Sequence, residues 1–173
     1  MNKTFTIKRM ALFALLLALK IILSRITGIS FGIVKLTFGF IATGLTGYLF
    51  GPYLACLAGG ITDLMGFFFF PQGTYFPGYT LTSMITGFIY GIILYKKKPT
   101  LLRILSAVAL EAIICSLLLN TLWTSILFGK AFFAILPARI IKNLLAIPLQ
   151  TCILSLIFKY LQKPLKQLSL IKS

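Results

Sequence analysis

The feature that most restricts the fold of this chain is a series of long apolar segments separated by short clusters of lysine and arginine. Apolar residues make up 59% of the 173 residues and charged residues only 11%. This composition is typical of integral membrane proteins. A helix needs roughly 20 apolar residues to cross a bilayer, so the length allows about six spans, and we expect no separate soluble domain.

The predicted fold is all-α, an integral membrane bundle of six transmembrane helices within one domain, residues 1–173. The predicted spans are residues 8–27, 34–50, 52–69, 79–95, 101–127 and 132–161. No small-residue cleavage site follows the first apolar segment, so we expect it to be retained as a span. Pro148 lies inside the last segment and predicts a kink there.

Lysine and arginine in the short connections predict the orientation. They gather before the first span, between the fourth and fifth, and after the sixth, at Lys3, Lys8, Arg9, Lys96, Lys97, Lys98, Arg103, Lys159, Lys163, Lys166 and Lys172. An even number of spans places these clusters on one side, so we expect the N- and C-termini to be cytoplasmic. Topology therefore accounts for the net charge of +15, and we expect no nucleic acid partner.

Residues 137–143, Pro-Ala-Arg-Ile-Ile-Lys-Asn, place two cations and an amide within an apolar segment. A charge at the bilayer centre costs roughly 2.5–3.5 kcal/mol even on insertion scales. On a helix, Arg139, Lys142 and Asn143 project from one face because Arg139 is three and four residues from the other two. We therefore expect this face to point into the protein rather than at lipid.

Further polar residues are predicted in the outer half of the membrane. Asp63 lies roughly 9 Å below the outer end of its span at 1.5 Å per residue, and Arg139 lies at a similar depth. Arg25 and Lys35 lie near the outer ends of the first two spans. Because cations converge where topology disfavours them, they predict a site for an anion taken from outside. The alternative is an ion pair of Asp63 with Arg139 or Lys142 that only holds helices together.

Glu111, the second of the two acidic residues, lies nearer the cytoplasmic side of the fifth span. We expect it to be structural and to pair with Lys20 or Arg103. In an alternative interpretation, Lys20 extends its amine to the membrane surface.

Aromatic residues gather around the connection at residues 70–78, which is rich in proline and glycine. Tyr75 and Phe76 belong to this loop, and Trp123 lies near the outer end of the fifth span, three residues after Asn120. In one interpretation these rings form an interfacial belt. In the other they form a lid or pocket wall that stacks on a flat ligand.

Ala11, Ala14 and Ala18 give the first span a small-residue face. Small residues let helices approach closely in lipid. The face either docks a partner subunit or packs inside the bundle.

Motifs for catalysis and for cofactors are lacking from the sequence. Gly129-Lys130 is followed by alanine and lacks the upstream glycine of a P-loop, so we expect no ATP binding. The chain has no histidine, and its three cysteines do not have the spacing of a metal site. We expect neither an enzyme nor a bound metal or cofactor, so uphill uptake would need a partner or an ion gradient.

Residues 36–41, 47–52, 75–81, 119–123 and 136–143 together resemble the folate-specific substrate-binding subunit of energy-coupling factor (ECF) vitamin transporters. The resemblance covers most of the chain in matching order, and the Arg-x-x-Lys-Asn run and the Tyr-Phe-Pro-Gly loop are its more specific parts. It implies a six-helix subunit of the bacterial plasma membrane that captures folate from outside. It also implies as partners a membrane coupling subunit, which would dock on the alanine face, and two cytoplasmic ATPase subunits.

The resemblance also predicts roles for the polar residues. Cationic side chains would neutralise the glutamate tail of folate, aromatic rings would stack on its rings, and Asp63 or Asn143 would bond the pterin. The predicted substrate-binding residues are Arg139, Lys142, Asn143, Asp63, Arg25, Lys35, Tyr75, Phe76, Trp123 and Asn120. The residues do not decide which end of the ligand meets which group. Another vitamin or a queuosine precursor is the near alternative, followed by a structural membrane protein and, last, a membrane enzyme.

Overall fold

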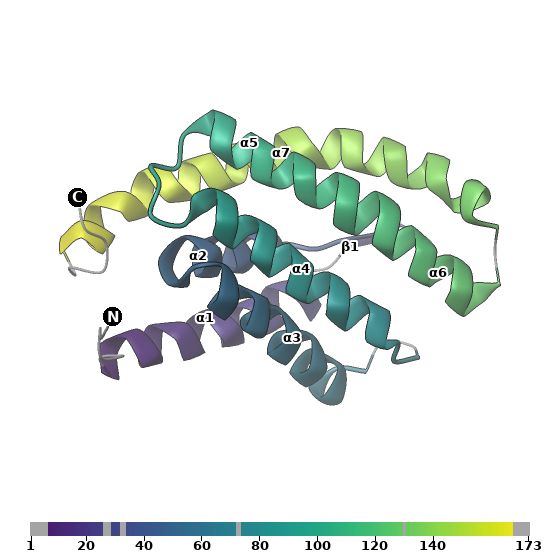
Figure 1. Cartoon of the computed structure of the whole chain (residues 1–173), viewed down its shortest axis with the longest axis horizontal. Helices are drawn as coiled ribbons and strands as arrows, with labels where there is room; N and C mark the ends of the chain where they lie inside the picture. The colour runs from purple at the N-terminus through teal and green to yellow at the C-terminus, as the bar shows by residue number, and fades with distance from the viewer. Residues whose placement is uncertain (1–6, 26–28, 32–33, 72–73, 130, 168–173) are drawn as a thin grey trace.

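The computed structural model describes residues 7–25, 29–31, 34–71, 74–129 and 131–167, and these fold into a bundle of helices (Figure 1). The helices are α1 (Ile7–Arg25), α2 (Gly39–Phe50), α3 (Pro52–Phe69), α4 (Pro77–Leu94), α5 (Leu101–Glu111), the π-helix η1 (Ala112–Leu119), α6 (Asn120–Phe128) and α7 (Phe132–Gln167). The segments α5, η1 and α6 follow one another without a break and form one rod. The predicted helical class is therefore confirmed for most of the chain.

A short hairpin between α1 and α2 is an addition to the predicted helices and corrects the bounds of the second predicted span. Strand β1 (Ile29–Phe31) pairs antiparallel with β2 (Val34–Leu36), with Ser30 opposite Lys35. Consequently α2 begins at Gly39 and not at residue 34, as the predicted span 34–50 required. Isoleucine and valine favour strands as well as membrane helices, so a short apolar run does not distinguish the two.

Four helical segments are long and apolar enough to cross a membrane. They are Pro52–Phe69, Pro77–Leu94, Leu101–Leu127 and Phe132–Leu161. Helix α2 has 12 residues, so it extends only about 18 Å, less than the roughly 30 Å of a hydrocarbon core. The described residues thus support a multi-pass membrane protein, and the count of six spans remains a prediction.

Glycines on α2, α3 and α4 allow these helices to pack backbone against backbone. A Cβ atom added at Gly59 of α3 would lie 2.2 Å from the Ser83 carbonyl oxygen of α4, and one at Gly87 would lie 2.1 Å from that of Ala55. A Cβ at Gly91 would lie 2.3 Å from Cα of Pro52. Small residues at such crossings let dispersion contacts form along the whole backbone, which is the main attraction between helices in lipid.

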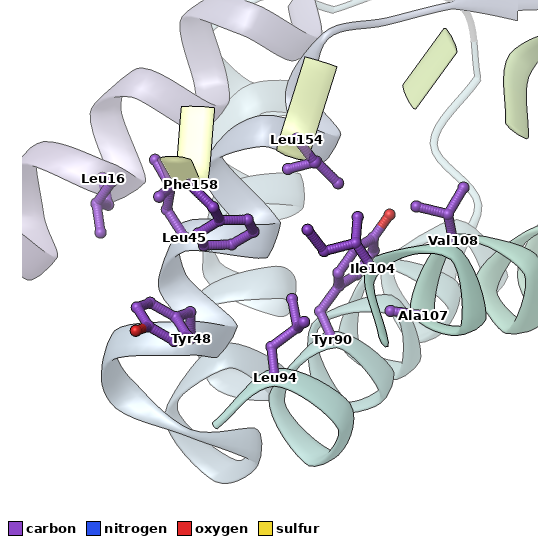
Figure 2. Packing of buried hydrophobic residues seen from close by; sticks show 10 residues of the cluster. All are labelled: Leu16, Leu45, Tyr48, Tyr90, Leu94, Ile104, Ala107, Val108, Leu154 and Phe158. Carbon is purple, nitrogen blue, oxygen red and sulfur yellow. The ribbon is translucent and has the colours of Figure 1, made fainter. Parts of the chain in front are cut away.

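The two ends of the bundle differ in character. The start of α1 and the end of α7 lie together at one end, which we call the terminal end (Figure 1). There a buried apolar cluster joins α1, α2, α4, α5 and α7 through Leu16, Leu45, Tyr48, Tyr90, Leu94, Ile104, Ala107, Val108, Leu154 and Phe158 (Figure 2). At the opposite end, which we call the distal end, α3 and α6 finish and α4 and α7 begin. The polar side chains described next lie between this cluster and the distal end.

Candidate binding cavity and the polar cluster beside it

A polar cavity of about 250 Å³ lies between the helices and is lined by residues from α1, α2, α4, α7 and the α5–η1–α6 rod. Its lining is rich in hydroxyl, amide and charged groups, supplied by Lys20, Ser24, Thr37, Gly39, Phe40, Thr43, Ser83, Thr86, Glu111, Ser116, Asn120, Lys142 and Gln150. Polar groups removed from both water and lipid need partners. A cavity that gathers so many of them is suited to a polar ligand.

Three of the lining residues carry charge. The buried amine of Lys20 donates a hydrogen bond to Ser83 Oγ at 3.2 Å, and Ser83 Oγ donates to the Gly59 carbonyl at 3.0 Å. Lys142 on α7 and Glu111 at the end of α5 also line the cavity, and they are near enough to interact electrostatically. With two ammonium groups and one carboxylate ionised, the cavity carries a net positive charge. This charge favours an anionic ligand.

The π-helix explains how one rod supplies several cavity residues. In η1 the backbone hydrogen bonds join residues five apart instead of four. Glu111 and Ser116, which are five residues apart, line the same cavity, and Asn120 joins them from the first turn of α6. A regular α-helix would turn Ser116 about 140° away from Glu111. The wide turn therefore brings these two side chains to the same cavity.

Arg139 of α7 lies one turn closer to the distal end than Lys142. Its Nη2 donates to Thr124 Oγ1 at 2.6 Å, and its Nη1 donates to the Ser116 carbonyl at 3.2 Å. Its buried Nε has no hydrogen-bond partner among the described residues, and the same holds for Nδ2 of the buried Asn143. Buried donors of this kind are rare in folded proteins and call for an explanation such as a ligand.

Aromatic side chains pack around the start of α4. The Phe76 ring lies 5.6 Å from the Trp123 ring and 6.1 Å from the Tyr79 ring, centroid to centroid. The Trp123 indole donates to Thr82 Oγ1 at 3.0 Å, and the Tyr79 hydroxyl lies 3.1 Å from Thr124 Oγ1. A Cβ at Gly78 would lie 2.5 Å from Trp123, so glycine is needed for this close contact. Through Thr124 the aromatic group is joined to Arg139.

A separate charged pair joins α1 to α3. Arg25 Nη2 lies 3.4 Å from Asp63 Oδ1 and donates to the Asp63 carbonyl at 3.3 Å. Thr80 Oγ1 donates to Asp63 Oδ2 at 2.8 Å, and the exposed Tyr75 hydroxyl lies 3.2 Å from Thr80 Oγ1. Neither Arg25 nor Asp63 lines the cavity. The alternative that Asp63 pairs with Arg139 or Lys142 is therefore wrong, because Arg25 is its ion-pair partner.

Comparison with known proteins identifies the family. The sequence profile described as "ECF transporter, substrate-specific component" matches residues 8–158. The chain belongs to this family. The family predicted from the sequence motifs is thereby confirmed, and it is a family of transporter components rather than of enzymes.

Among the relatives of this substrate-specific component are two bacterial proteins named Folate transporter FolT. The protein of Clostridium novyi is 36% identical over 141 residues, which are 82% of each chain. That of Leuconostoc mesenteroides is 32% identical over 149 residues, 83% of this chain and 80% of the relative. A solved structure titled "Crystal structure of FolT bound with folic acid" matches with a TM-score of 0.84 and 32% identity, covering 89% of this chain and 94% of that one.

The structure of this substrate-specific component separates the predicted site residues into groups. Lys142 and Asn120 line the cavity, and Asn143, Arg139, Trp123 and Phe76 belong to elements beside it. The Asp63–Arg25 pair and Tyr75 form a second group along α3 and α4. The side chain of Lys35 lies outside the described residues.

Two cavity residues of this family member were given structural roles by sequence reasoning. Glu111 does not pair with Arg103, which donates instead to the Lys98 carbonyl at 3.1 Å, and Lys20 is buried rather than extended to a membrane surface. Both line the cavity. The signal that would have found them is the rarity of charge within apolar spans, since such residues usually face the interior.

Proposed function

We propose that this protein is the folate-binding component of an ECF-type vitamin transporter and that it captures folate from outside the cell. The observation that carries the proposal is the net-positive, polar cavity beside an aromatic cluster, in a chain that aligns with 94% of a folic acid-bound FolT. Folate has a flat pterin, a benzoyl ring and a glutamate tail with two carboxylates. Each of these parts has a chemical counterpart among the residues of the distal half.

The counterparts follow from the contacts already described. Arg139 supplies positive charge for the carboxylates of the tail, since charge-assisted hydrogen bonds to carboxylates are among the strongest in proteins. Lys142 adds positive charge within the cavity. The unpartnered Arg139 Nε and Asn143 Nδ2 are donors that a ligand would satisfy. Phe76 and Trp123 offer ring surfaces for stacking, and Asn120 offers an amide in the cavity.

We assign the second polar group, the Asp63–Arg25 pair with Tyr75, to the rim of the site. Arg25 and Lys35 would attract the anion before it enters, and Tyr75 would contact it near the surface. Asp63 acts here through Arg25, which it holds against α3 at 3.4 Å.

The transporter class requires partners, because ATP-binding motifs are lacking from the sequence. We assign energy supply to two cytoplasmic ATPase subunits and a membrane coupling subunit. Ala11, Ala14 and Ala18 are exposed on α1, as a docking face for the coupling subunit requires. We place the protein in the bacterial plasma membrane with both termini in the cytoplasm.

The first test is the thermal stability of the detergent-purified protein with and without folic acid. A ligand that binds only the folded state stabilises it by RT ln(1 + [L]/Kd), about 4 kcal/mol at a thousandfold excess over Kd. We expect a large rise in Tm with folic acid and none with an unrelated dicarboxylic acid of equal charge. A folded protein that folic acid does not stabilise would contradict the proposal and move the assignment to another vitamin or a queuosine precursor.

A further inference from the structure

The cavity contains a group that an anion-binding site does not need. Of the two acidic residues of the chain, Asp63 is held by Arg25 and Thr80, whereas Glu111 lines the cavity. An ionised carboxylate in a low-dielectric space repels another carboxylate over several ångströms. The part of the ligand that lies against Glu111 is therefore not the dicarboxylate tail.

The chemistry of a carboxylate specifies what Glu111 would accept. An ionised carboxylate has two oxygens and only accepts hydrogen bonds, so it is complementary to a flat edge with two adjacent donors. The pterin of folate has such an edge, formed by the 2-amino group and the neighbouring ring N3–H. Folate's benzoyl ring and glutamate tail offer no pair of donors on one rigid edge. Glu111 therefore distinguishes one end of the ligand from the other.

The neighbours of Glu111 suit the remaining atoms of the same ring. Asn120 and Ser116 line the cavity on the same rod, and Lys142 lines it from α7. An ammonium group or an amide donates to a ring carbonyl oxygen such as the pterin 4-oxo group. The cavity thus combines an acceptor for the donor edge with donors for the adjacent acceptor atoms.

The positions of the other charges give the direction of the ligand. Arg139 precedes Lys142 on α7 and is bonded to Thr124, beyond Asn120 toward the distal end of α6. The unpartnered Nε of Arg139 and the aromatic rings of Phe76 and Trp123 therefore lie on the distal side of the cavity. A ligand with its pterin against Glu111 would extend its rings and its tail toward them.

We infer that Glu111 is a specificity-determining residue that binds the 2-amino-pyrimidinone edge of the pterin, so that folate enters with its pterin innermost and its glutamate tail toward Arg139. This inference rests on the proposed function, because it specifies the orientation of folate in that site. It also distinguishes Glu111 as a ligand-binding residue from a purely structural partner of Lys142.

The test is a cycle of two proteins and two ligands. Affinities of the wild-type protein and of Glu111→Gln are measured for folate and for a folate analogue that carries a methyl group in place of the 2-amino group. The glutamine has nearly the shape of glutamate but presents a donor where the ligand also has one. Arg103→Gln is the control, since Arg103 bonds the Lys98 carbonyl at the start of α5. Melting curves confirm that each variant is folded, and Glu111→Asp replaces the Gln variant if that one fails to fold.

We expect Glu111→Gln to weaken folate binding by at least about tenfold, the loss typical of a hydrogen bond to a charged group. The methyl analogue should bind the wild type less tightly than folate by a similar factor. It should bind the variant and the wild type almost equally, because the interaction that both changes remove is the same one. The Asp variant should retain part of the preference for folate over the analogue.

Other results would overturn the inference. Unchanged or tighter folate binding by Glu111→Gln would place the tail, or no ligand, near this carboxylate. If Glu111→Gln binds the methyl analogue with a loss of affinity equal to the product of the two single losses, Glu111 and the 2-amino group act independently. Failure of the wild type to bind folate would instead contradict the proposed function, and is thus distinguishable from an error in orientation.

Discussion

The terminal and distal halves of the bundle are built from the same helices but with opposite chemistry. On α4, Tyr90 and Leu94 are fully buried in the apolar cluster, whereas Thr82 and Ser83, two turns earlier, bond Trp123 and Lys20. Side chains of the cluster pack against one another, and among its described residues the Tyr90 hydroxyl is the one buried side-chain polar atom without a hydrogen-bond partner. The distal half keeps a polar cavity and two such nitrogen donors, on Arg139 and Asn143. The difference indicates that the terminal half holds the helices together and the distal half is left incomplete for a ligand.

The largest expected effect is on stability in the terminal half. Leu154 is fully buried, and its Cδ2 would lie 3.1 Å from a Cβ atom at Gly44. Leu154→Ala should lower the free energy of unfolding by about 2–5 kcal/mol, because the cavity left behind loses packing contacts. The measurement is the Tm of the purified protein, with Leu156→Ala as control, since Leu156 is 55% exposed on the same helix.

If the two halves are independent, the folate affinity of this variant should not change. Folded Leu154→Ala should bind folate with nearly the affinity of the wild type, because Leu154 does not line the cavity. A large loss of affinity at a temperature where the variant is folded would show that the two halves are not independent.

The second expected effect is on binding in the distal half. Arg139→Gln removes the charge and the unpartnered Nε donor but keeps a side-chain amide that can bond Thr124. We expect folate affinity to fall by about 1.5–3 kcal/mol, the value of a hydrogen bond to a charged group. Isothermal titration measures the affinity, and Arg103→Gln controls for the loss of one arginine.

The stability of the ligand-free protein should fall less in Arg139→Gln than the loss of its hydrogen bonds alone would predict. An arginine that is partly desolvated before the ligand arrives is costly in the free protein. The Tm of Arg139→Gln without folate should therefore be close to that of the wild type, while the rise on adding folate shrinks. Equal losses of Tm with and without folate would assign Arg139 a structural role instead.

Sequence reasoning predicted the spans and the cations of α7 because both depend on local pattern. The apolar segments predicted helices, and Pro52–Phe69 has the predicted bounds. The spacing of Arg139 and Lys142 places them on one side of a helix. Pairing across helices was not predictable, since the predicted depths of Arg25, Arg139 and Lys142 in the membrane all allowed an ion pair with Asp63. The place of Ser116 and Asn120 in the cavity was not predictable either, because a π-helix changes the rotation of every following residue and no periodic rule foresees it.

The smallest expected effect concerns the pair that joins α1 to α3 in the distal half. The side chains of Arg25 and Asp63 are 17% and 22% exposed, so water or headgroups screen their attraction. Asp63→Asn keeps an acceptor for Thr80 and should cost at most about 1 kcal/mol, as for a typical exposed ion pair.

A cycle of Asp63→Asn, Arg25→Gln and the double variant, followed by Tm, isolates the coupling between them. Non-additive losses of Tm with unchanged folate affinity would assign the pair to helix packing. A loss of affinity in Arg25→Gln that exceeds the loss in Asp63→Asn would instead place Arg25 at the rim of the binding site, where its charge meets the anion.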